Sequence, residues 1–263
     1  MPSQTRFAIP IACAFMLLSA QALQAQTQPP AQTATEATLK KPTDFRTRIE
    51  VRTEHQDLEG DAHRELVVPR LDYAVKSSLA FRLELPYITS DPGGNGRRVS
   101  GQGDVLTRGV WRAYRDSGLD VILATDLIFD TADDDRLGFG KTVLAPHVFA
   151  AVDLPKYNSV FFPNIQHYFS VAGQDDRADV NFTTVRPNLL TRWPNKVYTF
   201  LEPQFTIDWD NNDKVGFTVE LEVGKILSSN VAAWARPGVG VINRGDVSQV
   251  YDWNIELGMR YVF

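Results

Sequence analysis

Apolar and polar side chains alternate over most of this chain, and a period of two residues is the pattern of β-strands. The first clear run reads FRTRIEVRTE from Phe45 to Glu54, with every second residue charged. Successive side chains of a strand point to opposite faces of the sheet. This strand therefore has one largely apolar face and one almost wholly charged face, a division that fits either a soluble or a membrane sheet.

The number of such runs and the lengths of their connections narrow the choice. Twelve strand-like runs cover residues 45–56, 64–76, 78–88, 103–115, 119–130, 141–153, 158–171, 180–192, 197–209, 214–226, 230–242 and 249–263. Five connections are minimal (76–78, 116–118, 154–157, 193–196, 227–230), and six are longer and polar (56–63, 89–103, 131–140, 172–179, 210–213, 243–248). Strands of about ten residues, an even strand number and alternating short and long connections are typical of outer-membrane barrels. The short turns then lie on the periplasmic side together with both chain ends.

The final strand adds a more specific signal. Its sequence, YDWNIELGMRYVF, has the following residues on one face: Tyr251, Trp253, Ile255, Leu257, Met259, Tyr261 and Phe263. This ladder resembles the C-terminal signal that the barrel assembly machinery reads, so Phe263 and its strand predict that machinery as a partner. In lipid every backbone N–H and C=O must be paired, and only a closed sheet has no unpaired edge. We therefore predict an all-β fold, a monomeric transmembrane antiparallel up-and-down barrel of about 12 strands with periplasmic termini, rather than a soluble sandwich.

The first 25 residues read as a signal peptide rather than as part of the fold. Arg6 precedes an apolar run from Phe7 to Ala20, and small residues permit cleavage at Ala22 or Ala25. A retained N-terminal anchor is the alternative. Residues 26–43 are polar and rich in Pro and Thr, so they cannot bury enough apolar surface to order themselves. The predicted organisation is a signal peptide at 1–25, a flexible periplasmic segment at 26–43 and an outer-membrane barrel at 44–263.

Charge and residue types argue against several function classes. Cys13 is the only cysteine and would leave with the signal peptide, so a thiolate site is not expected. Without Arg6, 26 Lys+Arg stand against 32 Asp+Glu, a net charge of −6 that argues against nucleic acid as a partner. His167 and Ser170 are three residues apart and face opposite sides of a strand, which does not suit a hydrolase. The acidic run Asp133–Asp135 fits a solvated loop tip, or a site for divalent cations bridging lipopolysaccharide. We expect no enzyme activity, no catalytic residue, no metal site and no cofactor.

The inward face of the predicted barrel carries both signs of charge. Basic residues dominate the first four strands and recur on the eighth, whereas acids dominate the fifth, ninth and tenth. A separation of charge across the lumen could orient a dipolar solute. The same charges could instead pair with one another, because burying an unpaired charge is costly.

Prolines recur at a similar distance from the periplasmic turns, on the lipid side of six strands: Pro69, Pro146, Pro163, Pro187, Pro203 and Pro237. Because proline cannot donate to the ladder, we expect irregular strand pairing at this level. One hypothesis is a solute-binding constriction, lined by Arg70, His147, Asn164, Asn188, Gln204, Arg108 and Arg112. The other is that the prolines slow misfolding before insertion.

Two glycine-rich segments resemble a known family. GQGDVLTRGVWR (Gly101–Arg112) resembles the G-x-G-D segment of outer-membrane transporters linked to meta-pathway phenol degradation, and LGFGKTVLAPHV (Leu137–Val148) resembles the segment that follows it. The resemblance implies passive uptake of small organic solutes, aromatic or hydrophobic ones among them. The alternatives are a closed structural or adhesion barrel without conductance and a membrane-embedded lipid-modifying enzyme.

Overall fold

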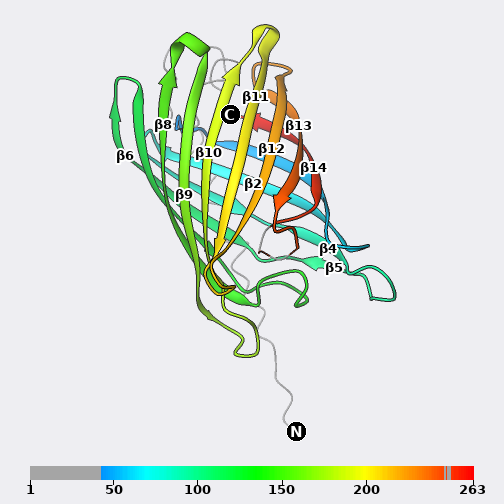
Figure 1. Cartoon of the computed structure of the whole chain (residues 1–263). Helices are drawn as coiled ribbons and strands as arrows, with labels where there is room; N and C mark the ends of the chain where they lie inside the picture. Colours follow the sequence, from blue (N-terminus) through cyan, green and yellow to red (C-terminus); the bar gives the residue numbers. More distant parts are fainter. Residues whose placement is uncertain (1–42, 246, 248–249) are drawn as a thin grey trace, which may run out of the picture. The chain divides into compact units, whose positions relative to one another are not determined.

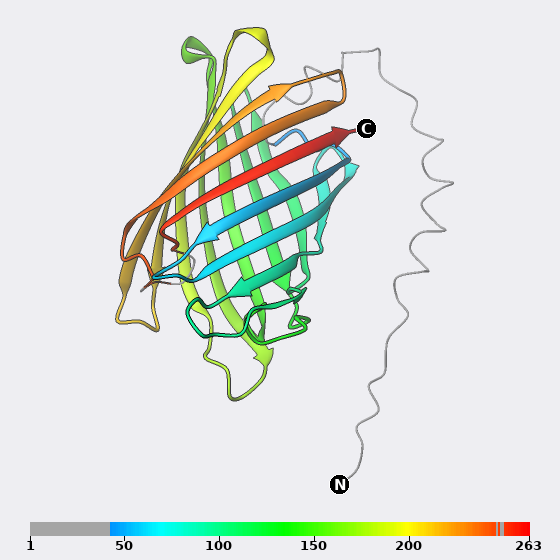
Figure 2. The same ribbon diagram turned by 90° about the vertical axis from the view of Figure 1, so that its right-hand side faces the viewer.

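The computed structural model describes residues 43–245, 247 and 250–263, which fold as one antiparallel sheet. The predicted signal peptide (1–25) and residues 26–42 of the predicted flexible segment lie outside the described residues. β1 (Arg48–Asp57) pairs with β14 (Trp253–Val262) on one side and with β2 (His63–Lys76) on the other. These two pairings close the sheet into a barrel (Figures 1 and 2).

The other strands follow around the wall in chain order. They are β3 (Leu79–Glu84), β4 (Tyr87–Asp91), β5 (Val99–Gln102), β6 (Leu106–Asp116), β7 (Leu119–Ile128), β8 (Lys141–Leu154), β9 (Ser159–Gly173), β10 (Asn181–Arg192), β11 (Val197–Asp208), β12 (Lys214–Ile226) and β13 (Val231–Ile242). Two turns contain the 3-10 helices η1 (Pro155–Tyr157) and η2 (Pro194–Lys196). β3 and β4 are two halves of one strand, and β5 and β6 are two halves of the next. The closed barrel therefore has the predicted 12 strands.

The two divided strands are broken side by side. Pro86 lies between β3 and β4, and residues 103–105 lie between β5 and β6. Proline has no N–H to donate, and its carbonyl accepts a hydrogen bond from the N–H of Gly103 at 2.9 Å. The pairing register differs by one residue on the two sides of the break. The barrel wall is thus irregular at the first of the two glycine-rich segments.

The five predicted short turns lie at one end of the barrel, the end of Thr43 and Phe263, and we call it the periplasmic end. The expected long loop at 89–103 is shorter than predicted. β4 and β5 continue the strands as a hairpin, so only residues 92–98 form its loop. Gly93 and Gly94 have φ of 74° and 55° at the tip, a conformation that glycine adopts without strain.

Large apolar side chains cover the outer face of the wall. Phe81, Leu257 and Ile49 are each about half exposed, at 51%, 51% and 46%. A continuous apolar surface of this kind suits contact with lipid rather than water. No stretch of the described residues forms a helix long and apolar enough to cross a membrane.

Exposed aromatic side chains gather near the two ends of the strands. Tyr157, Trp193 and Tyr261 lie towards the periplasmic end, and Trp209 and Trp253 lie towards the long loops. This is the arrangement of the two interfacial girdles of a membrane barrel.

The prediction that Tyr251 belongs to the lipid-facing ladder is wrong. Its side chain is buried, and its hydroxyl donates to Glu220 of β12 at 2.5 Å. The strand begins only at Trp253, and the preceding chain turns to the inner face. Gly240 makes this possible, since a Cβ there would collide with the Tyr251 carbonyl.

Strand pairing is irregular beside some of the prolines and regular beside others. The β10–β11 ladder lacks bridges around Pro187 and Pro203 and resumes in the same register. The β12–β13 ladder has a similar gap at Pro237. Pro69, in contrast, lies opposite Val51 in an unbroken ladder. The missing N–H groups therefore weaken the pairing on some strands without changing the register.

Candidate functional site

The inner face over β7–β11 is divided into layers. An apolar cluster lies towards the long loops: Ile128, Val143, Val180 and Phe182, with Leu106, Phe139 and Tyr168 packed against it. A second lies towards the periplasm: Ala151, Val160, Leu190 and Tyr198, with Phe162 and Phe200 packed against it. The Phe149 ring continues the second layer, 4.9 Å from the Phe162 ring. Between the two layers the inward residues are polar, and we call this level the waist.

Asp126 is the centre of the waist. Its side chain is 1% exposed. Arg108 donates to both of its oxygens, at 2.5 and 2.7 Å, and Gln166 donates at 2.9 Å. Nε2 of His147 lies 3.6 Å from the same carboxylate. The carboxylate is thus removed from water and compensated by a bidentate arginine, which is the strong form of such a pair.

The other half of the waist is held by Arg186 and by neutral amide groups. Arg186 donates to the amide oxygens of Gln204 at 2.5 Å and Gln166 at 3.3 Å. Asn164 and His147 make one long contact of 3.4 Å. Side-chain oxygens of Asn164 and of the buried Asn188 have no hydrogen-bond partner in the protein. Both oxygens are buried as well as unpaired, so a solute or water reaches this hydrogen-bonding capacity only when neighbouring side chains move.

Two aromatic rings of the inner face lie over glycines of the next strand. Tyr198 is directly opposite Gly224, and Trp234 is directly opposite Gly258. A Cβ on either glycine would overlap the ring. Glycine is needed at both positions so that the rings can lie flat against the wall.

The wall of β1, β2, β3, β12, β13 and β14 carries a network of ion pairs. Glu50 accepts hydrogen bonds from Arg70 at 2.6 Å and Arg260 at 2.8 Å, and Arg70 also donates to Glu84 at 2.8 Å. The other pairs are Arg48–Asp72, Arg82–Asp72, Arg52–Glu84, Arg52–Glu256 and Arg236–Glu222. Acids and arginines share the same strands here, so a basic wall facing an acidic wall does not describe this part of the lumen.

A third cluster lies at the periplasmic end. Thr43 is buried, and its hydroxyl donates to Asp120. Arg112 donates to the Thr43 carbonyl at 2.5 Å, and Arg115 binds both Asp120 and Asp44. A cavity of about 1060 Å³ lies beside these residues. The chain that enters the barrel is thus tied to the inside of its periplasmic mouth.

The residues predicted to line one constriction lie at three places. Arg108, His147, Asn164 and Gln204 belong to the waist. Asn188 lies opposite Phe162, at the periplasmic edge of the waist. Arg70 belongs to the charged wall, and Arg112 belongs to the periplasmic mouth. That these seven residues together form a constriction stays a prediction.

The two segments that carry the family resemblance contact each other. The carboxylate of Asp104 accepts hydrogen bonds from the backbone N–H of Phe139 at 2.7 Å and of Thr131 and Ala132 at 3.1 Å. A Cβ on Gly138 would lie 2.5 Å from this carboxylate. Asp104 therefore fixes the loop between β7 and β8 at the long-loop end.

The acidic run in that loop is used in local contacts. Asp133 accepts a hydrogen bond from the N–H of Gln102 at 2.8 Å. Arg136 donates to Asp134 at 2.9 Å, which lowers the pKa of Asp134 to about 2. Asp135 lies 3.6 Å from Arg177. Within residues 43–245, 247 and 250–263, no group of three metal-ligating side chains comes together.

The histidine and serine considered for hydrolysis have other partners. Nδ1 of His167 lies 3.0 Å from the hydroxyl of Thr183. The Ser170 hydroxyl donates to Asp179 at 3.0 Å. This arrangement does not form the base-activated nucleophile that covalent hydrolysis needs.

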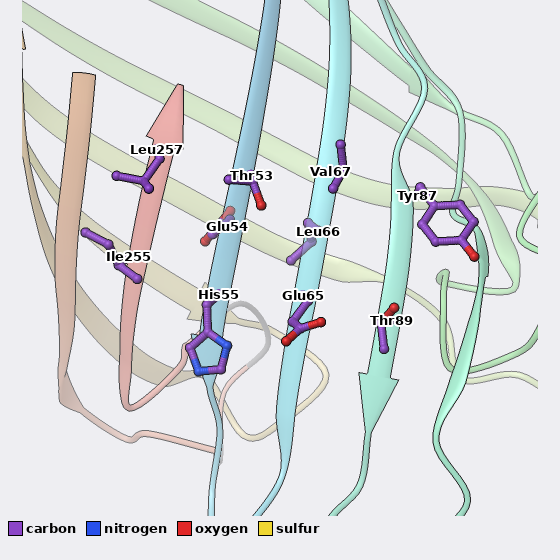
Figure 3. Close-up of a pocket in the computed structure, with 10 residues that line it drawn as sticks. All are labelled: Thr53, Glu54, His55, Glu65, Leu66, Val67, Tyr87, Thr89, Ile255 and Leu257. Carbon is purple, nitrogen blue, oxygen red and sulfur yellow. The ribbon is translucent and has the colours of Figure 1, made fainter. Parts of the chain in front are cut away.

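A smaller cavity of about 330 Å³ lies against the wall of β14, β1, β2 and β4 (Figure 3). Val67, Tyr87 and Leu257, all exposed on the outer face, line it together with His55 and Glu65. It is a feature of the membrane-facing side of the wall rather than of the waist.

The comparisons with known proteins identify the fold. No family model and no curated protein matches the chain. The COG4313 outer membrane channel from Pseudomonas putida F1 is similar with a TM-score of 0.63 and 12% identity, covering 90% of this chain and 100% of that one. For the NanC porin the TM-score is 0.59 with 11% identity, covering 81% and 98%.

The KdgM porin is also similar, with a TM-score of 0.56 and 10% identity, covering 82% of this chain and 99% of that one. At such identities the likeness shows the fold alone, and it does not confirm the finer resemblance to meta-pathway transporters. These neighbours are porins and channels rather than enzymes, and together with the closed barrel they support the predicted outer-membrane localisation. The described chain has the barrel fold of outer-membrane porins and channels.

Proposed function

We propose that this barrel is an outer-membrane channel for the passive passage of small organic solutes, those with aromatic or other apolar bodies above all. The observation that carries the proposal is the layered inner face of β7–β11, where two aromatic-rich layers flank the waist. The half-buried rings of Phe162, Phe200 and Tyr168 still expose apolar surface, and each Å² removed from water gains about 25 cal/mol, so these layers can hold an apolar body. The free hydrogen-bonding groups of the waist can hold its polar end.

A closed barrel without conductance is the second candidate, and burial at the waist favours it. Asp126 and Gln166 are each 1% exposed, and Asn188 is 3% exposed. A 12-stranded barrel has a narrow lumen, because barrel diameter grows with strand number. Side chains alone could therefore close the lumen.

Planar-bilayer recordings and liposome swelling decide between the two candidates. We expect discrete conductance steps, and faster swelling in phenyl β-glucoside than in methyl β-glucoside after correction for size. Phe162→Ala should reduce this preference, because it removes a ring from the inner layer. Phe81→Ala is the matched control, since its ring lies on the lipid face. Folded protein that gives neither steps nor swelling would reject the channel proposal.

A further inference from the structure

The lengths of the charged side chains decide which charge a solute in this lumen meets. Each charge of the lumen is attached to the wall, and the guanidinium of Arg extends further from its Cα than the carboxylate of Asp or Glu. In a set of ion pairs on a concave wall, the acids therefore lie near the backbone and the arginines cover them. Equal numbers of the two charges need not give a neutral inner surface.

The exposed fractions of most of the paired side chains follow this rule, and the Arg186–Glu202 pair, at 18% and 21%, is the exception. The side chains of Arg52, Arg70, Arg82, Arg108, Arg236 and Arg260 are 13% to 21% exposed. Six of the acids that pair with them are less accessible, at 1% to 12% exposed: Glu50, Asp72, Glu84, Asp126, Glu222 and Glu256. Glu220, a second partner of Arg236, is 17% exposed. The accessible surface of these ion pairs therefore belongs mainly to the arginine side chains.

Arg186 brings the same charge to the waist. Its hydrogen bonds go to the neutral amides of Gln204 and Gln166, and its nearest acid contact is Glu202 at 3.6 Å. Arg186 is four residues from Phe182 and four from Leu190 on the same face of β10, so it lies between the two apolar layers. A solute that moves between these layers passes this guanidinium.

We infer that the lumen prefers anions to cations, and that its favoured organic solute joins a carboxylate to an apolar body, with Arg186 as a specificity-determining residue. A carboxylate matches the planar fork of a guanidinium with two parallel hydrogen bonds. The apolar layers on either side of Arg186 accommodate the rest of such a molecule. This inference rests on the proposed channel function and adds the class of solute to it.

Two lumen variants and one outer variant test the inference through the chloride-to-potassium permeability ratio. Arg186→Gln should lower that ratio about sevenfold, because one charge about 7 Å from the path in a water-like dielectric changes the permeabilities of the two ions in opposite directions, each by a Boltzmann factor of about 2.7. Glu202→Gln should raise it, because the Glu202 side chain is an acid still 21% exposed. Arg98→Gln removes the same charge from an exposed pair with Glu65 and should leave the ratio unchanged.

Current block by benzoate, with benzamide as its neutral counterpart, tests the organic solute. Benzoate should block the native channel at a lower concentration than benzamide does, and Arg186→Gln should remove this difference. A channel that prefers cations, or whose ratio and benzoate block do not respond to Arg186→Gln, would overturn the inference and leave the channel proposal standing. Folded native protein without any conductance would overturn both.

Discussion

The stability lost when the Arg108–Asp126 pair is broken shows whether water enters the waist. Arg108→Met removes the bidentate partner and leaves the Asp126 carboxylate, 1% exposed, with the neutral Gln166 and with His147 at 3.6 Å. Breaking a buried pair by removing one partner costs about 3–5 kcal/mol, whereas a hydrated pair contributes about 0–1 kcal/mol. We expect the free energy of unfolding to fall by about 3 kcal/mol. This is the lower end of the range for a buried pair, because Arg82, directly opposite Arg108, loses a repulsive neighbour.

The assay is reversible urea unfolding in lipid vesicles, followed by tryptophan fluorescence. Asp126→Asn in the Arg108→Met background removes the unpaired charge and should recover most of the loss, giving a large coupling energy in the double-mutant cycle. A loss below about 1 kcal/mol with no recovery in the double variant would mean that water fills the waist. This result would refute the inference that side chains alone close the lumen at the waist.

Three further outcomes follow from local geometry. Gly224→Leu should lower the free energy of unfolding by about 1–3 kcal/mol, because the Tyr198 ring occupies the space of the new side chain; urea unfolding without a loss would contradict this packing. Asp104→Ala should speed hydrogen exchange in residues 131–139, since three backbone N–H groups lose their acceptor; unchanged exchange would show that something else holds the loop. NMR should show the Asp134 carboxylate titrating near its lowered pKa of about 2. The lowered pKa stabilises the folded loop at pH values above the ordinary pKa of an aspartate, and this stabilisation is lost as the pH falls towards 2. An unchanged titration midpoint in Arg136→Gln would contradict the assigned cause.

The barrel wall could be predicted because its two faces meet different media. Most residues that face lipid are apolar, so the alternation of apolar and polar residues along a strand shows which side chains face outwards. This is why the twelve runs and five short turns of the sequence recur in the structure. The errors lie where the chain leaves the regular ladder, at Pro86, where one strand is divided, and at Tyr251, which turns inwards over glycines.

The lumen could be predicted only in part, because alternation gives the face of a residue but not its height. Arg112 shares the inward face with Arg108, yet it binds Thr43 at the periplasmic mouth, next to a bulge in the β6–β7 ladder. Height depends on strand tilt and register, which a single strand does not encode. The aromatic layers were accessible to the same reasoning, because Phe149 and Phe162 share the inward face with His147 and Asn164.

The two sides of the lumen differ in how firmly their side chains are held, and this bears on where a path can open. On the charged wall Glu50 and Glu84 each bind more than one arginine, and separating such buried pairs costs about 3–5 kcal/mol each. On the amide side Arg186 holds Gln204 at 2.5 Å, and the other contacts are single hydrogen bonds of 3.3–3.4 Å. Hydrogen bonds between neutral groups contribute about 0.5–1.5 kcal/mol each, and those to a charged group about 1.5–3 kcal/mol. A solute therefore displaces the amides more easily than the ion pairs. The expected path runs along the aromatic side of the waist, past Arg186, with the arginine network of the charged wall as its fixed opposite side.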